Sequence, residues 1–169
     1  NSLQILITDE LWSDSVGEEI RNYFAAPTEG LPQEEPLFSI NQMDPSTFSG
    51  FIKSNRLFLH VTIGKEDKFT LVTNEYAKPQ TGAIITAKTK EGLIKLIAEK
   101  QEEIIEAFFK SEIKERQRRT SISPLVIDSL KERFGLNIKM PSAYRIAHKG
   151  SDFYWLRKDL KKTGSTNIL

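Results

Sequence analysis

The chain has 169 residues, and its 24 Lys and Arg against 23 Asp and Glu leave a formal net charge of +1. Hydrophobic residues make up 38% and charged residues 28%, which is typical of a globular protein and excludes a disordered or membrane-embedded one. Cysteine is absent, which excludes disulfides, thiolate metal sites, iron–sulfur clusters and cysteine nucleophiles.

The first residues predict a strand, a helix and a long loop. An apolar run over residues 3–8 predicts a strand that is too short to span a bilayer. Apolar residues at helical spacing, with acids in the first turn, predict an amphipathic helix over residues 14–25. Three prolines and a glycine within residues 25–36 break any regular element, so this segment is expected to be a defined surface connection.

The middle of the chain predicts β-structure. Residues 37–40 resume as a strand, and Asp44-Pro45 has the form of an N-cap followed by a proline at the first helical position, which predicts a short helix. Alternating or uniformly apolar runs then predict three strands, over residues 57–63, 69–73 and 82–87.

The remaining residues predict two helices and several short strands. A long helix from about residue 89 to 119 carries one apolar face, and a second helix over residues 124–134 ends at Gly135. Further strands are predicted over residues 136–140, 144–148 and 153–157, the last two as a β-hairpin. The chain stops at residues 167–169 in what has the pattern of another strand, without a predicted partner.

This order of elements predicts an α+β fold, with a long amphipathic helix and shorter helices packed on a largely antiparallel sheet, followed by a β-hairpin region. We expect one α+β domain over residues 1–120, in the order β-α-β-α-β-β-β-α. Residues 121–169 form an α-β-β-β segment, which is either part of the same domain or the start of a truncated second half.

Charge is divided unevenly along the chain. Residues 1–50 contain one basic residue, Arg21, and nine acids, so this segment carries −8 and the other 119 residues carry +9. Such a division steers a partner or supports head-to-tail association, or else the two halves neutralise each other across one fold. Sequence separation does not decide between these alternatives.

No residue pattern specifies a catalytic or metal site. His60 and His148 have no second histidine at zinc-ligand spacing, and phosphate-binding glycine loops and nucleophile elbows are absent. Paired acids such as Glu34-Glu35 could supply half of a glycosidase dyad, although such pairs are common at turns and on solvated faces. We therefore favour a non-enzymatic role, without cofactor, metal or nucleic acid, and leave catalysis open.

Two patterns suggest contact with a partner. The basic run Lys114–Arg119 could bind phosphates or lipid headgroups, or could simply complement the dipole at a helix C-terminus. Trp12 and the triplet Phe153-Tyr154-Trp155 could form a stacking platform or belong to the core. With the proline loop, the candidate partner-binding residues are Trp12, Pro32, Glu34, Glu35, Arg116, Arg118, Arg119 and Trp155.

Several stretches together resemble a known family. They span nearly the whole chain and comprise residues 9–12, the proline loop with its flanks at 23–38, and residues 76–80, 114–119, 134–145 and 155–159. The chain thereby resembles an uncharacterised family of Bacteroidetes-type envelope lipoproteins, catalogued as domain of unknown function 4837. The proline loop is the most specific part of this resemblance.

The resemblance implies a location but no activity. Members of the family resemble exported lipoproteins with a signal peptide, a lipidated cysteine and a mature portion about twice as long as this chain. The chain would then be the N-terminal part of a mature lipoprotein in the cell envelope, attached to the membrane only through a lipid anchor that these residues do not include. The family implies no substrate, catalytic residue or oligomeric state.

Three hypotheses follow. The first is a non-enzymatic envelope module that binds a partner protein or a glycan. The second is a hydrolase that acts on envelope polysaccharide through two carboxylates brought together in a cleft. The third is a structural scaffold that a missing C-terminal half completes, with an exposed apolar edge near residues 167–169.

Overall fold

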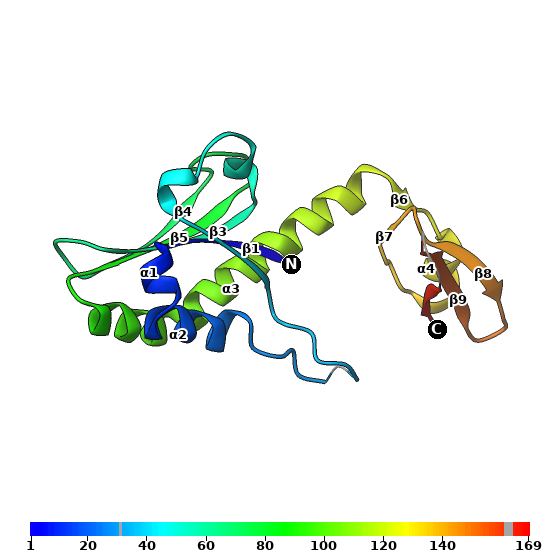
Figure 1. Ribbon diagram of the computed structural model, residues 1–169. Coiled ribbons are helices and arrows are strands. Elements are labelled where there is room, and N and C mark those ends of the chain that lie inside the picture. Colours follow the sequence, from blue (N-terminus) through cyan, green and yellow to red (C-terminus); the bar gives the residue numbers. More distant parts are fainter. Residues whose placement is uncertain (31, 161–163) are drawn as a thin grey trace. The chain divides into compact units, whose positions relative to one another are not determined.

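Figure 1 shows the computed structural model, which describes residues 1–30, 32–160 and 164–169. The chain divides into two compact units, an N-terminal unit of residues 1–112 and a C-terminal unit of residues 113–169. The border falls within the 33-residue helix α3 (Lys90–Ile122), a few residues before the boundary at 120 that the sequence predicts. No helix among the described residues is long and apolar enough to cross a bilayer.

The N-terminal unit is built on one five-stranded sheet. Its strands, in spatial order, are β2 (Ser39–Met43), β1 (Ser2–Leu6), β3 (Leu57–Ile63), β5 (Thr81–Ala87) and β4 (Lys68–Thr73). The first three neighbouring pairs are parallel, and β4 pairs antiparallel with β5. The short helices of this unit are α1 (Asp9–Trp12), α2 (Ser15–Phe24) and the 3-10 helices η1 (Pro45–Thr47) and η2 (Gly50–Ser54).

The C-terminal unit begins with the last turns of α3 and is otherwise made of short elements. A three-stranded antiparallel sheet has the order β10-β9-β8, and a second pairing joins β6 to β7. The bounds are β6 (Pro124–Leu125), α4 (Asp128–Phe134), β7 (Met140–Pro141), β8 (Arg145–Lys149), β9 (Tyr154–Asp159) and β10 (Ser165–Ile168).

The predicted α+β class is confirmed, but the sheet of the N-terminal unit is mixed rather than largely antiparallel. The chain leaves β1 through α2 and returns as β2 in the same direction, which a crossover connection requires of parallel neighbours. Strand β4 does turn back after β3 as predicted, yet β5 inserts between the two and takes both as partners. Alternation of apolar residues reports burial and carries no information on strand direction, which explains the difference.

Three details of the C-terminal unit also differ from the prediction. Helix α4 starts at Asp128, because Pro124 and Leu125 are paired in β6. The strand predicted over residues 136–140 is reduced to the two residues of β7. The last strand has a partner after all, since β10 pairs antiparallel with β9, and its apolar end residues Ile168 and Leu169 are exposed.

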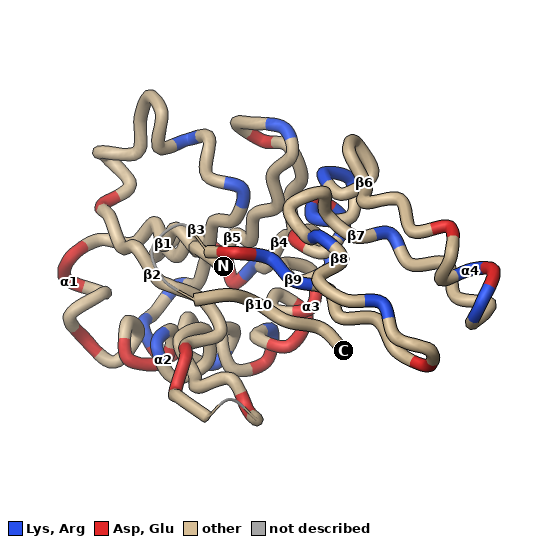
Figure 2. Tube along the Cα trace, turned by 90° about the vertical axis from the view of Figure 1, so that its right-hand side faces the viewer, with Lys and Arg blue, Asp and Glu red and all other residues tan. Residues whose placement is uncertain are grey.

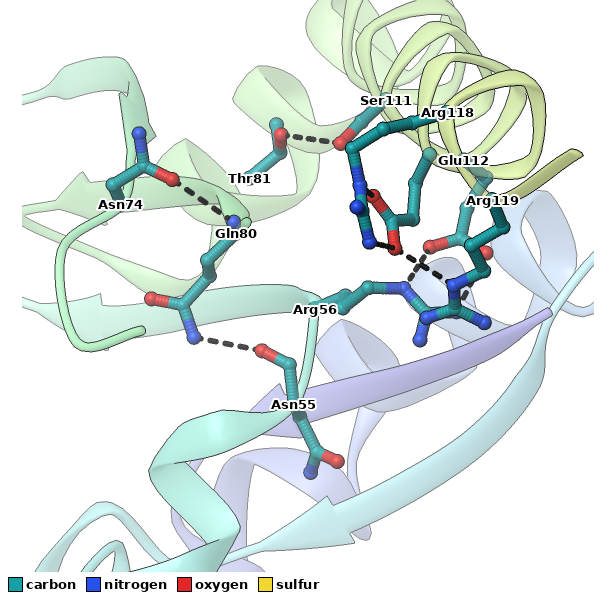
Figure 3. Close-up of polar contacts among 10 residues, drawn as sticks. Asn55, Arg56, Asn74, Gln80, Thr81, Ser111, Glu112, Arg118 and Arg119 are labelled. Atoms are coloured by element: carbon teal, nitrogen blue, oxygen red, sulfur yellow. Dashed lines mark hydrogen bonds and ion pairs between the residues drawn. The ribbon is translucent and has the colours of Figure 1, made fainter. Parts of the chain in front are cut away.

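The main core lies between one face of the five-stranded sheet and the helices α2 and α3 (Figure 1). The apolar faces of these elements supply it, as the helical and alternating patterns predict. Its fully buried members include Leu3, Ile5, Val61, Ile97 and Phe108. At the end of α3 within this unit, the Arg56 guanidinium forms a two-pronged ion pair with the buried carboxylate of Glu112, at 2.7 and 2.8 Å (Figure 3).

On the other face of the sheet, an aromatic cluster is held by a buried amide. The rings of Phe48, Phe58 and Tyr76 contact one another at centroid distances of 5.2 to 6.3 Å. The Gln80 side-chain amide donates to the carbonyls of Lys53 and Asn55 at 2.8 and 2.7 Å and accepts from the Tyr76 amide at 2.9 Å. Gln80 thus joins the segment after β4 to the end of η2 (Figure 3).

Gly17 offers a test of this packing, because helix propensity and contact geometry predict opposite effects of an alanine on the stability of the protein. A Cβ on Gly17 of α2 would overlap the backbone oxygen of Trp12, which cannot move independently of α1. We expect Gly17→Ala to lower the free energy of unfolding by about 1–3 kcal/mol, although alanine favours an isolated helix by about 1 kcal/mol. Urea denaturation measures this change, with the exposed Asn22→Ala on the same helix as control. A more stable Gly17→Ala protein would contradict the close approach of α1 and α2.

Candidate functional site

A hollow of about 580 Å³ lies in the C-terminal unit between the last turns of α3 and the segment before β7. Two of the residues that line it are cationic, four are uncharged and polar, and one is apolar. They are Ile113, Arg116, Gln117, Thr120, Ser121, Asn137 and Lys139. No carboxylate lines this hollow, which we call the basic groove.

The helical repeat of α3 creates the groove wall. At 100° per residue, Ile113, Arg116, Gln117 and Thr120 follow the spacing i, i+3, i+4, i+7 and therefore lie on one face. Asn137 and Lys139 provide the other wall of the groove, from a stretch without helix or strand between α4 and β7.

Two other cations of the basic run, Arg118 and Arg119, lie on the opposite face of α3, where both bind Glu115. The Glu115 carboxylate accepts from Arg118 Nε at 2.7 Å and Nη2 at 3.0 Å, and from Arg119 Nε at 2.7 Å. Its side chain is only 6% exposed. The hydrogen bonds from Arg118, and then those from Arg119, lower the pKa of Glu115 to about 2.

The lining of the groove therefore supplies hydrogen-bond donors from several kinds of side chain. Arg116 contributes a planar guanidinium and Lys139 an ammonium, while Gln117 and Asn137 contribute amides, and the hydroxyls of Thr120 and Ser121 both donate and accept. Such a set suits a phosphate, sulfate or carboxylate, which accepts several charge-assisted hydrogen bonds at once. Ile113 adds a small apolar surface for the body of such a ligand.

A second hollow, of about 140 Å³, lies in the same unit and has a different character. Residues 124–128, 131 and 136–139 line it, with Asp128 as the single carboxylate of that lining. Neither hollow brings two carboxylates together, so the glycosidase dyad of the hydrolase hypothesis finds no site in them. Among the described residues, no group of three His, Asp or Glu is placed to hold a metal ion.

The predicted acidic residues lie on a projecting loop of the N-terminal unit. We call residues 26–30 and 32–37, between α2 and β2, the acidic arm (Figure 1). Its two strands are joined by a bridge between Pro27 and Pro36 and by hydrogen bonds from Thr28 N to Glu35 O at 2.8 Å and from Leu37 N to Ala26 O at 2.9 Å. Its exposed residues include Glu29, Pro32, Glu34 and Glu35.

The two tryptophans among the candidate residues have well-defined surroundings. The half-buried Trp12 lies under the Arg21 guanidinium, 4.6 Å from the ring centroid, and packs against the main core. Trp155 is half-buried on β9, and its indole Nε1 donates to Asn167 Oδ1 on β10 at 2.9 Å. Its neighbours Tyr154 and Leu156 are buried, so the Phe153–Trp155 triplet is core on one side and partly open on the other.

The candidate residues are thus distributed over both units. Trp12, Pro32, Glu34 and Glu35 belong to the N-terminal unit, and the three arginines and Trp155 belong to the C-terminal unit. Of the eight, Arg116 alone lines the basic groove. The spacing of residues 113, 116, 117 and 120 already marks one helix face, but no sequence signal assigns Asn137 and Lys139 to the same site.

Charge follows the division into units. Residues 113–169 contain 13 Lys and Arg against 5 Asp and Glu, a net +8, which leaves −7 for residues 1–112. In Figure 2 acidic residues recur along α1 and α2 of the N-terminal unit, and basic residues recur around β8 and β9 of the C-terminal unit. The neutral total therefore combines an acidic unit with a basic one.

Comparison with known families separates the same two regions. Residues 1–121, more than half of the chain, match the family described as Domain of unknown function (DUF8532), and the chain belongs to this family. Residues 123–169 match Domain of unknown function (DUF4837), which supports over this stretch the resemblance drawn from the sequence. Searches among curated proteins and among solved structures found no match to the chain.

The low pKa of Glu115 predicts a pH-dependent loss of stability. Because the folded pKa is about 2 and the ordinary value is 4.5, the contribution of this carboxylate is complete above about pH 4.5 and is lost as the pH falls towards 2. We expect Glu115→Gln to be less stable than the native protein at pH 6, and the difference to shrink towards pH 2. Thermal unfolding followed at several pH values measures this.

Glu102→Gln is the matched control, because Glu102 is exposed on α3 and forms no ion pair within the part of the chain that the structure describes. A difference between Glu115→Gln and the native protein that stays constant from pH 6 to 2 would contradict the proposed ion pairs of Glu115.

Proposed function

We propose that the chain is a non-catalytic binding module whose basic groove holds an acidic group of a partner protein or glycan. The single observation that carries this proposal is the composition of the groove: two cations and four polar side chains from two separate segments, with no carboxylate among them. A helix end that only complemented its dipole would need no second wall with a further cation, Lys139.

The position of Glu115 supports the same conclusion. It engages Arg118 and Arg119 on the far side of α3, so these two arginines contribute to the helix itself rather than to the groove. Arg116 lies on the other face, beside Gln117 and Thr120. The helix therefore places Arg118 and Arg119 on one face and Arg116 on the face that lines the groove.

The net charge of the C-terminal unit supports an acidic partner. A charge of +8 over 57 residues attracts polyanions over distances comparable to the screening length and weakens as salt rises. A cell-envelope location, implied by the resemblance to domain of unknown function 4837, belongs to this proposal. Acidic glycans and acidic protein surfaces are the partners of this chemistry.

Charge reversal in the groove tests the proposal. Isothermal titration with polygalacturonate and with inorganic polyphosphate compares the native chain with the double variant R116E/K139E. Because each charge-assisted hydrogen bond contributes about 1.5–3 kcal/mol, we expect the variant to bind the preferred polyanion at least about tenfold more weakly. Raising the salt concentration is expected to reduce the difference.

The control is K114E, which reverses one charge on the same helix at a residue that does not line the groove. We expect it to weaken binding only slightly, through the overall charge. Equal losses for K114E and for the single variants R116E and K139E would show a diffuse charge effect and contradict the groove as the binding site. Absence of binding of either polyanion to the native chain would contradict the proposal as well.

A further inference from the structure

We infer that the acidic arm of one molecule docks into the basic groove of a second copy, so that this chain associates with itself head to tail. The inference rests on the proposed function, because it identifies the acidic partner of the groove as another copy of the same protein. In this arrangement the acidic N-terminal unit supplies the ligand for the basic C-terminal unit.

The arm is suited to insertion. Backbone hydrogen bonds pair its two strands near its base, and the Pro27–Pro36 bridge limits their freedom, so little order has to be gained on binding. Glu29, Glu34 and Glu35 are exposed, and the arm contains no Lys or Arg. It therefore presents a carboxylate-rich surface that no cation of its own sequence neutralises.

The groove complements this surface in charge and in size. Arg116 and Lys139 match the glutamates, and the amides and hydroxyls of the lining can bind the carbonyl groups of a proline-rich backbone, which offers few donors. A volume of about 580 Å³ accommodates several side chains. Ile113 provides an apolar contact for a proline ring such as that of Pro32, which is exposed on the arm.

Long-range charge favours the same pairing. The N-terminal unit carries −7 and the C-terminal unit +8, so unlike units of two molecules attract and like units repel. Contacts between like patches are disfavoured, so the arm of one molecule meets the groove of the other. This head-to-tail contact can be single, as in an open chain with one free arm and one free groove at its ends, or can be made twice in a two-fold dimer.

Sedimentation equilibrium with complementary variants tests this arrangement. The arm variant E34Q/E35Q keeps a native groove, and the groove variant R116Q/K139Q keeps a native arm. We expect the native chain to associate, as a dimer or a larger assembly, between about 1 and about 100 µM at low salt and to dissociate as salt rises. Each variant alone should remain monomeric.

The mixture of the two variants gives the decisive result. One native groove and one native arm remain between the two proteins, so an equimolar mixture should form a heterodimer and nothing larger. The control pair E18Q/E102Q and K114Q changes exposed charges outside the arm and groove and should assemble like the native chain. Circular dichroism and thermal unfolding confirm that every variant is folded.

Two outcomes would overturn the inference. One is a native chain that stays monomeric over this concentration range at low salt. This outcome includes a monomer whose compactness changes with salt because its arm binds its own groove. The other is a mixture of arm and groove variants that does not associate. If polygalacturonate or polyphosphate binding still depends on Arg116 and Lys139 in either case, the proposed function stands and the self-association alone is wrong.

Discussion

The hydrogen bonds of Glu115 determine what the basic run at the end of α3 can do. Four of the six residues from Lys114 to Arg119 are cationic, which would make this a uniformly positive helix end. Glu115 is nearly buried and accepts from both Arg118 and Arg119, so these side chains are directed to one face. The helical repeat then leaves Arg116 on the opposite face, in line with the polar residues of the groove. Glu115 thus binds two of the four cations on one face of the helix, and Arg116 lines the groove on the other.

The same helix serves both units. Its first turns bury Leu93, Ile97 and Ile104 against the five-stranded sheet, and the Arg56–Glu112 ion pair secures the last turn that belongs to the N-terminal unit. Two parallel charge-assisted hydrogen bonds to a nearly buried carboxylate attach this turn to the segment before β3. Three residues further along α3, Glu115 lies on the same side of the helix as Glu112, and the basic groove lies on the other side. A helix anchored in the core of the N-terminal unit thereby supplies one wall of the groove in the C-terminal unit.

Much of the fold could be predicted from sequence, and most of the site could not. The periodicities located α2, β3, β5 and α3 to within a few residues, because burial of one face imposes a repeat on the sequence. Strand direction and the insertion of β5 between β3 and β4 depend on tertiary pairing, which leaves no local pattern. The basic run identified Arg116, yet the partition by Glu115 required knowledge of its burial. Lys139 and Asn137 join the site through a stretch without regular structure, where periodicity is uninformative.

The central claim is that Arg116 faces a ligand site while Arg118 and Arg119 remain bound to Glu115. Nuclear magnetic resonance of the arginine Nε–H groups in nitrogen-15-labelled protein, titrated with inorganic polyphosphate, tests it most directly. We expect the Arg116 resonance to shift strongly, and the Arg118 and Arg119 resonances, whose Nε–H groups donate to Glu115, to change little. Equal shifts for all three, or shifts confined to Arg118 and Arg119, would contradict it.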